Sequence, residues 1–176
     1  MSKTPATAAS LKEVIDALQM QGEMASSYIH KHDGRIVELA PDGFDEDDDA
    51  DEEDLDDWQI EARAEARMVA KDDAWIALPD QFEINEYRIM EDFIDEVEPQ
   101  RDAEILANSI RGSGAFRRFK DMVNTMGIEK DWYAFLNQAM ARIAARFLDV
   151  NEIPWKNDVP GFVRDGGGST SKENSD

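Results

Sequence analysis

The sequence predicts an α+β fold in which an N-terminal helix and a small antiparallel sheet precede a C-terminal four-helix region. The sheet is expected to consist of a hairpin plus one strand. Apolar residues recur at helical spacing near the N-terminus and through the second half, whereas β-branched and aromatic runs beside Gly and Pro lie between these parts. The chain has 176 residues, 41% of them apolar, which suits a single domain with its own core.

The first helix is predicted to begin after Ser10. Ser10 and Glu13 have the spacing of a capping box, in which the hydroxyl accepts from the third helical amide and the carboxylate reaches back. One apolar stripe follows at helical spacing: Leu11, Val14, Ile15 and Leu18. The helix is therefore expected to extend to about Met20 or Met24.

The sheet is predicted from residues 26–39 and 74–78. The first stretch holds two strand-forming runs on either side of Asp33-Gly34, a pair suited to the positive φ angles of a tight hairpin turn. The second is a short apolar run that ends at Pro79. It is expected to pair with the hairpin, because a two-stranded hairpin alone is marginally stable.

The remaining elements are predicted to be helices. Residues 58–71 are rich in Ala, Arg, Glu and Met, which are good helix formers. Four further helices are expected at 84–97, 102–110, 115–126 and 130–150. Pro99, Gly112 and Gly127 separate them, and Gly112 is expected to adopt a positive φ just beyond a helix C-terminus.

Acidic residues dominate the charge. The net charge is −21, and residues 42–57 hold twelve acids and no bases, which leaves −21 + 12 = −9 for the rest. Such a run is typical of a solvated, disordered insertion, since it buries no apolar surface to offset its ordering entropy. The alternative is a mimic of the phosphate backbone that occupies a basic or DNA-binding partner.

The expected organisation is one globular domain with disordered additions. The domain spans 10–155 and contains an acidic disordered insertion at 42–57. A disordered N-terminus covers 1–9, and a disordered Gly/Ser tail covers 156–176.

Composition narrows the class of protein. The chain has no cysteine, which excludes disulfides and thiolate chemistry and suits a reducing cytosol. No apolar run has the length of a secretory signal core or a membrane-spanning helix. We therefore expect a soluble, cytoplasmic protein with no membrane partner.

The most distinctive segment is basic and aromatic and spans 110–121. Two glycines separated by one residue allow the backbone to pass close to a bulky group, and the helix expected at Ala115 offers an N-terminus that attracts anions. Arginine forks bind phosphate or carboxylate. The candidate anion-binding residues are Arg111, Gly112, Gly114, Arg117, Arg118 and Lys120.

A structural interpretation of this segment is favoured over the functional one. It is a helix–helix turn in which Phe116 and Phe119 pack inward, and its arginines pair with nearby acids such as Glu91, Asp92 or Asp95. The Gly-Ser-Gly piece lacks the spacing of a phosphate-binding loop.

Two other groups of residues are less convincing candidates for a functional site. His30 and His32 would share one strand face and could chelate a metal, but a third ligand is missing and an exposed hairpin face is favoured. The aromatic group at 132–135 could stack on a base, although core packing is favoured. No nucleophile motif occurs. We assign no catalytic residue, no metal and no cofactor.

Several segments together resemble a known family. In chain order they are Leu18-Gln-Met-Gln21, Ser27-Tyr28, Ile76-Ala-Leu-Pro79, Glu86-Tyr-Arg-Ile-Met-Glu-Asp-Phe-Ile94, Ile110-Arg-Gly-Ser-Gly-Ala-Phe-Arg-Arg-Phe-Lys-Asp121 and Trp132-Tyr-Ala-Phe135. The pattern resembles the bacterial Uncharacterised Protein Family 0158 over about residues 10–153. The resemblance implies a small, soluble, bacterial α+β protein, and it implies no activity.

Three functions remain open. The first is a non-enzymatic binding or regulatory module of unknown ligand, in which the turn from Arg111 to Lys120 engages phosphate, nucleic acid or an acidic peptide. The second is an acidic decoy that uses 42–57. The third is a small carboxylate-dependent enzyme acting on an anionic substrate. A net charge of −21 argues against non-specific nucleic-acid binding.

Overall fold

The computed structural model describes residues 7–21, 25–40 and 55–164. Its helices are α1 (Leu11–Met20), α2 (Asp57–Lys71), α3 (Gln81–Ile84), α4 (Glu86–Glu96), α5 (Gln100–Ser109), α6 (Ala115–Met126) and α7 (Glu129–Val150). Its strands are β1 (Ala9–Ser10), β2 (Ser26–His30), β3 (Ile36–Leu39), β4 (Trp75–Ala77) and β5 (Trp155–Lys156). The predicted α+β class, with its helical C-terminal region, is confirmed.

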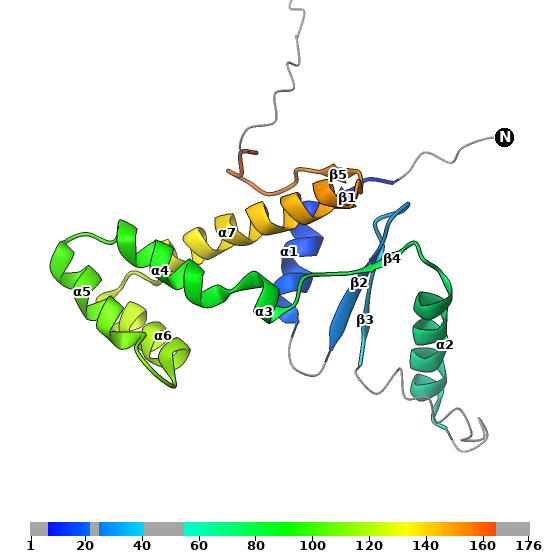
Figure 1. The fold of residues 1–176 in the computed structure, drawn as a ribbon, viewed down its shortest axis with the longest axis horizontal. Coiled ribbons are helices and arrows are strands. Elements are labelled where there is room, and N and C mark those ends of the chain that lie inside the picture. The colour runs from blue at the N-terminus through cyan, green and yellow to red at the C-terminus, as the bar shows by residue number, and fades with distance from the viewer. Residues whose placement is uncertain (1–6, 22–24, 41–54, 165–176) are drawn as a thin grey trace, which may run out of the picture.

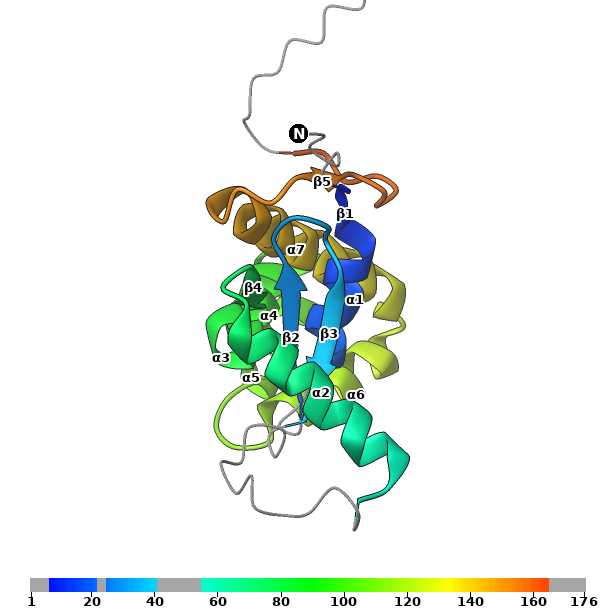
Figure 2. The ribbon, with the colours of Figure 1, turned by 90° about the vertical axis from the view of Figure 1, so that its right-hand side faces the viewer.

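The predicted three-stranded sheet is present. Its strand order is β3-β2-β4, and both pairings are antiparallel. Tyr28 of β2 lies opposite Val37 on one side and Ala77 on the other. The sheet separates α2 from α1, which lies on its other face with the rest of the helical body (Figures 1 and 2).

The hairpin loop is longer than the sequence suggested. Residues 31–35 connect β2 to β3, and the His30 amide donates to the carbonyl of Arg35 over 2.8 Å. Within this loop Gly34 has φ +71°, and a Cβ atom there would lie 2.7 Å from the Cα of Ala9. The prediction of a hairpin is confirmed, but the tight turn centred on Asp33-Gly34 was wrong. Gly34 serves a close approach to the N-terminal strand as well as the turn.

Most of the core lies among the helices. Phe119 is fully buried at its centre, and its ring lies 4.7 Å from that of Trp132 and 6.2 Å from that of Phe93. A separate small cluster joins α2 to the sheet through Leu39, Ala66, Val69 and Trp75. The sheet is therefore packed on both faces, but much less deeply on the face that α2 covers.

The helix predicted at 84–97 is interrupted. Asn85 has φ +52° and ψ +64°, so it ends α3 and begins α4. Its side-chain oxygen accepts a hydrogen bond from the Arg88 amide over 3.3 Å, and this bond caps α4. Asn tolerates the left-handed region better than other non-glycine residues, which explains why it occupies the break. The other predicted helices match the structure to within two residues at each end.

The folded part extends beyond both predicted ends of the domain. Ala9 is buried and pairs with Trp155 in a parallel two-stranded sheet formed by β1 and β5. Val159 and Phe162 are buried in the main core, so the predicted start of the tail at 156 was too early. Residues 1–6 and 165–176 lie outside the described residues.

The acidic insertion is described only at its end. Asp56 caps α2 together with Gln59, and Asp57 is the first residue of that helix, so the predicted insertion overlapped the helix by these two residues. Residues 41–54 lie outside the described part of the chain. No helix among the described residues is both long enough and apolar enough to cross a bilayer.

Candidate functional site

The candidate anion-binding segment forms the connection between α5 and α6. Helix α5 ends at Ser109, and α6 begins at Ala115. Gly112 and Gly114 both have positive φ, +76° and +77°, which a side chain would strain. The positive φ expected at Gly112 is confirmed. Two left-handed residues so close together reverse the chain within a few residues.

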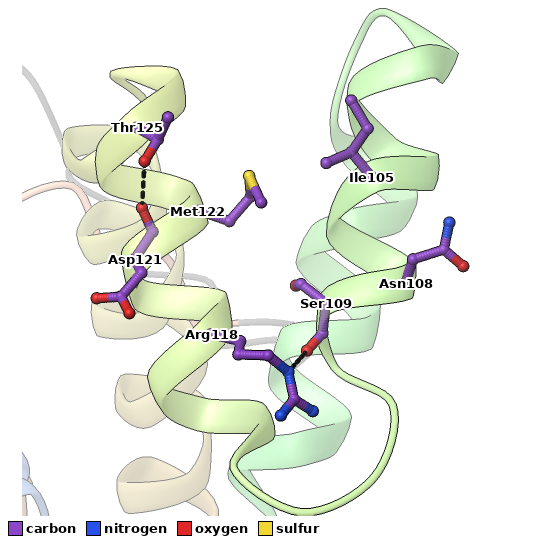
Figure 3. A pocket seen from close by; sticks show the side chains of 7 residues that line it. All are labelled: Ile105, Asn108, Ser109, Arg118, Asp121, Met122 and Thr125. Atoms are coloured by element: carbon purple, nitrogen blue, oxygen red, sulfur yellow. Dashed lines mark hydrogen bonds between the residues drawn. The ribbon is translucent and has the colours of Figure 1, made fainter.

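Arg118 holds this connection together. From the first turn of α6, its Nε donates to the carbonyl oxygen of Ser109 over 2.9 Å (Figure 3). Its Nη1 donates to the carbonyl of Ser113 over 2.6 Å, and its Nη2 donates to that of Arg111. A cation at the C-terminal end of α5 also faces the negative end of the helix dipole. The guanidinium is thus used within the turn.

The close approach expected at the glycines involves the protein's own side chain. A Cβ atom on Gly114 would lie 3.2 Å from Nη1 of Arg118, whereas one on Gly112 would meet nothing within 4 Å. The group that comes close to Gly114 is therefore the Arg118 guanidinium. This contact gives Gly114 a structural role that the sequence pattern alone did not separate from ligand binding.

The other cations of the segment are exposed. Arg111, Arg117 and Lys120 make no ion pair or hydrogen bond through their side chains to any residue that the structure describes. Beside them, Phe116 is 43% exposed. These three cations and Phe116 form what we call the cationic turn surface.

The structural interpretation of the segment was right about one aromatic residue only. Phe119 packs inward, but Phe116 does not. Of the acids suggested as partners, Asp92 pairs instead with Arg88, its neighbour on α4, over 3.2 Å. Arg118 does bind within the protein, but its guanidinium donates to carbonyl oxygens rather than to carboxylates. The segment is therefore a structural turn that also carries cations without a partner among the residues that the structure describes.

An open groove lies beside the turn, between α5 and α6. Its volume is about 500 Å³. Ile105 and Met122 contribute its apolar side chains from opposite helices (Figure 3). Asn108, Asp121 and Thr125 are the polar residues of its lining. Ser109 and Arg118 lie where the groove approaches the turn. The groove is lined by neither Glu91 nor Asp95.

Among the described residues, the histidine pair is not part of a group that could hold a metal ion. Nδ1 of His30 lies 2.9 Å from Asp33 Oδ1, off the line of a hydrogen bond, and Nε2 lies 3.6 Å from Asp72 Oδ2. The His30 ring also meets Trp75 edge-on at 4.9 Å. His30 is thus a packed residue at the end of β2. Within the ranges that the structure describes, no three His, Asp or Glu residues are placed to hold a metal ion.

The aromatic group at the start of α7 divides between core and surface. Trp132 is buried against Phe119, as the favoured interpretation predicted, and Phe135 is half-buried beside Phe93. Tyr133 is exposed on the outside of the helix. A base-stacking platform of all three rings is therefore not present.

Asp158 is a structural anchor that the sequence did not indicate. Its carboxylate accepts from the Ser10 hydroxyl over 2.5 Å and from the Lys12 amide over 2.9 Å. Partial burial acts to raise the pKa of Asp158, but these two hydrogen bonds, a third from its own backbone amide and the charge of Lys156 together outweigh it, so the pKa lies below its ordinary value. The Ser10 oxygen also accepts from the Glu13 amide, which confirms half of the predicted capping box. Because 148 residues separate Ser10 from Asp158, no local pattern could reveal the contact.

Comparisons with known proteins place the chain in one family. The comparison with curated proteins and the comparison with solved structures each found no significant match. The family model described as Uncharacterised protein family (UPF0158) matches residues 5–158. That range contains the whole turn from Arg111 to Lys120 and ends at Asp158. The chain belongs to this uncharacterised protein family.

Proposed function

We propose that the protein is a non-enzymatic binding or regulatory module that engages an anionic group at the cationic turn surface. Arg111, Arg117 and Lys120 supply the charge. Gly112 and Gly114 give the turn its shape, and Arg118 fixes it. The anionic group is a phosphate, a nucleic-acid backbone or an acidic peptide. The observation that carries the proposal is the exposure of three cations without an acidic partner among the described residues, in a chain of net charge −21.

The excess of acidic residues in the chain makes the lack of a described partner for these cations significant. The chain has 40 acidic residues and 19 Lys or Arg, so a surface cation has many acids to pair with. Elsewhere cations do pair, as Arg88 does with Asp92 and Arg164 does with Asp149. Because these cations form no ion pair with a described residue, an outside anion has no such pair to break before it binds.

The surrounding negative charge restricts what can bind. Long-range repulsion from the acidic body opposes a polyanion, and screening by salt reduces that repulsion. A short anionic segment that reaches only the turn avoids most of it. We accordingly infer local recognition rather than non-specific nucleic-acid binding.

Two alternatives receive less support. The acidic decoy depends on 42–57, most of which lies outside the described residues. The carboxylate-dependent enzyme would place Arg111 and Arg117 across an open cavity from Glu91 or Asp95, and the groove beside the turn has none of these four residues in its lining. We further infer a bacterial, cytoplasmic setting, from the family resemblance and the absence of cysteine.

The test is a binding measurement with defined anions. Wild-type protein is titrated with sodium triphosphate, a six-residue glutamate peptide and a single-stranded oligonucleotide at low and moderate salt. The double variant Arg117→Ala/Lys120→Ala is expected to lose at least about tenfold in affinity for the anion that binds, as two charge contacts are removed. Its thermal stability should stay close to wild type.

A matched control carries the same change in net charge. Arg146→Ala/Lys71→Ala removes two exposed cations from α7 and α2, away from the turn. It should bind as wild type does. Equal losses in the two double variants would mean that net charge alone governs binding, and the proposal would then be wrong. Unfolding of Arg117→Ala/Lys120→Ala would instead assign these cations to the fold.

A further inference from the structure

The groove between α5 and α6 has apolar side chains that are only partly buried in the core. Met122 is half-buried and packs against the main core from α6. Ile105 is half-buried on α5, but it is not among the described residues that pack against that core. Figure 3 shows both side chains reaching into the space between the two helices. Together they form a site for an apolar side chain from outside.

One end of this groove is cationic. Arg118 lies there, and three of its five N–H groups donate to the carbonyls of the turn. No described bond uses the other two. Arg111, whose carbonyl is one of those acceptors, and Arg117 are exposed cations of the same turn, although neither lines the groove. The acid in the lining is Asp121, three residues along α6 from Arg118. An anionic group there would meet full positive charges while its apolar neighbour fills the groove.

The volume of the groove fits a side chain rather than a whole domain. About 500 Å³ of open space accommodates one or two large apolar side chains. Inorganic phosphate would gain nothing from Ile105 and Met122, since an ion has no apolar surface to bury. A peptide can use both features at once. The acidic body would repel an acidic peptide that lacked an apolar anchor.

We propose that the occupant is a peptide segment of another protein in which an apolar side chain lies next to an acidic residue. The apolar side chain enters between Ile105 and Met122, and the acidic side chain binds the free N–H groups of Arg118 with support from Arg111 or Arg117. This inference rests on the proposed anion-binding function and names the partner of that surface. Charge complementarity at the turn and the apolar groove beside it select this partner together.

Nuclear magnetic resonance titrations of the full chain test the proposal with three probe peptides. Acetyl-Leu-Glu-Glu-amide carries both features, acetyl-Gly-Glu-Glu-amide lacks the apolar anchor, and acetyl-Leu-Lys-Lys-amide lacks the acids. The first should shift the methyl signals of Ile105 and Met122 and the Nε–H signal of Arg118. The other two should bind at least about fivefold more weakly, as each forfeits one contact.

Two variants examine the groove directly. Ile105→Ala removes one apolar wall and should weaken the leucine-glutamate peptide about fivefold without changing the glycine-glutamate peptide. Thr125→Trp fills the groove from an exposed position, so it should abolish methyl shifts without disturbing the core. Ile60→Ala, at an exposed apolar position of α2, is the matched control and should behave as wild type.

The outcomes separate this inference from the proposed function. Equal binding of the leucine-glutamate and glycine-glutamate peptides, unaffected by Thr125→Trp, would overturn the groove proposal and leave the anion surface in place. Binding of triphosphate alone would have the same effect. Self-association that Ile105→Ala abolishes would make a second copy the occupant and would also overturn it. If no anion bound, both the groove proposal and the proposed anion-binding function would be wrong.

Discussion

Two charged side chains each hold a helix end in this protein, and their surroundings differ. Arg118 donates to three carbonyls between Ser109 and Ser113 at the C-terminal end of α5. Asp158 accepts from Ser10 and Lys12 at the N-terminal end of α1. Each has the charge that is favoured by the dipole of the helix end that it binds, α5 for Arg118 and α1 for Asp158. Both bind the backbone, and neither forms an ion pair among the described residues.

The neighbours of the two residues explain why only one region is a candidate site. Near Asp158, the charge of Lys156 is opposite in sign and helps to lower the pKa of the carboxyl. Near Arg118 in sequence lie three cations, Arg111, Arg117 and Lys120, and one acid, Asp121. The Asp158 contact is electrostatically complete, whereas the turn has an excess of positive charge. An anion can bind the positive charge at the turn that no described contact neutralises.

Removal of the Arg118 guanidinium should have the largest effect on stability. Arg118→Ala leaves three carbonyls at the turn without their donor, and charge-assisted hydrogen bonds are the stronger class. Since part of the turn is exposed to water, we expect a loss of about 2 kcal/mol in the free energy of unfolding. Urea denaturation followed by circular dichroism measures it.

A lysine at this position separates the effect of the charge from that of the guanidinium geometry. Arg118→Lys keeps the charge but cannot bridge three carbonyls in a plane, so it should recover less than half of the loss. Full recovery would show that charge alone matters at the turn, against the geometric role assigned to the guanidinium fork.

The two glycines of the turn should differ in their sensitivity. Gly112→Ala and Gly114→Ala both place a side chain at positive φ, which costs about 1 kcal/mol each. Gly114→Ala must also displace Arg118, since its Cβ would lie 3.2 Å from Nη1. Gly114→Ala should therefore be the more destabilising variant, as read by thermal denaturation. Equal melting temperatures would argue against the close contact.

The Asp158 contact should have a smaller, pH-dependent effect. Asp158→Ala removes two hydrogen bonds from a largely exposed carboxylate, so a loss of about 1 kcal/mol is expected at pH 7. A carboxyl whose pKa is lowered by folding stabilises the protein above its unfolded pKa. That stabilisation disappears as the pH falls through the lower, folded value.

The pH series for this variant therefore has a defined shape. The difference in stability between wild type and Asp158→Ala should be constant above about pH 5 and should shrink below about pH 4. Thermal melts at constant ionic strength provide the measurement. A difference that grew at acidic pH would mean that the pKa of Asp158 is raised, contrary to the hydrogen bonds observed.

The sequence predicted elements that depend on local patterns. The apolar stripe of α1, the glycines that end α5 and α6, and the strand that ends at Pro79 all follow from residues within a few positions of one another. The break at Asn85 was missed because the apolar spacing continues across it, and a single left-handed residue leaves no mark in that spacing. The five-residue hairpin loop was missed because Asp33-Gly34 also fits a shorter turn.

Contacts between segments far apart in the chain could not be predicted from the sequence. The β1–β5 pair joins residues near the two ends of the chain, and two-residue strands have no periodicity to detect. The candidate site was found by its residues, but the division of roles within it was not. Arg117 and Arg118 are identical in type and adjacent, and only the fold turns one toward the carbonyls of the turn.

Hydrogen exchange of the arginine Nε–H groups tests this division most directly. In wild-type protein labelled with ¹⁵N, the Nε–H of Arg118 donates to Ser109 and should be protected, while those of Arg111 and Arg117 should exchange rapidly. Addition of the glutamate peptide should slow exchange at Arg111 or Arg117 and leave the protection of Arg118 in place. Rapid exchange at Arg118, or protection of Arg117 without any ligand, would contradict the account.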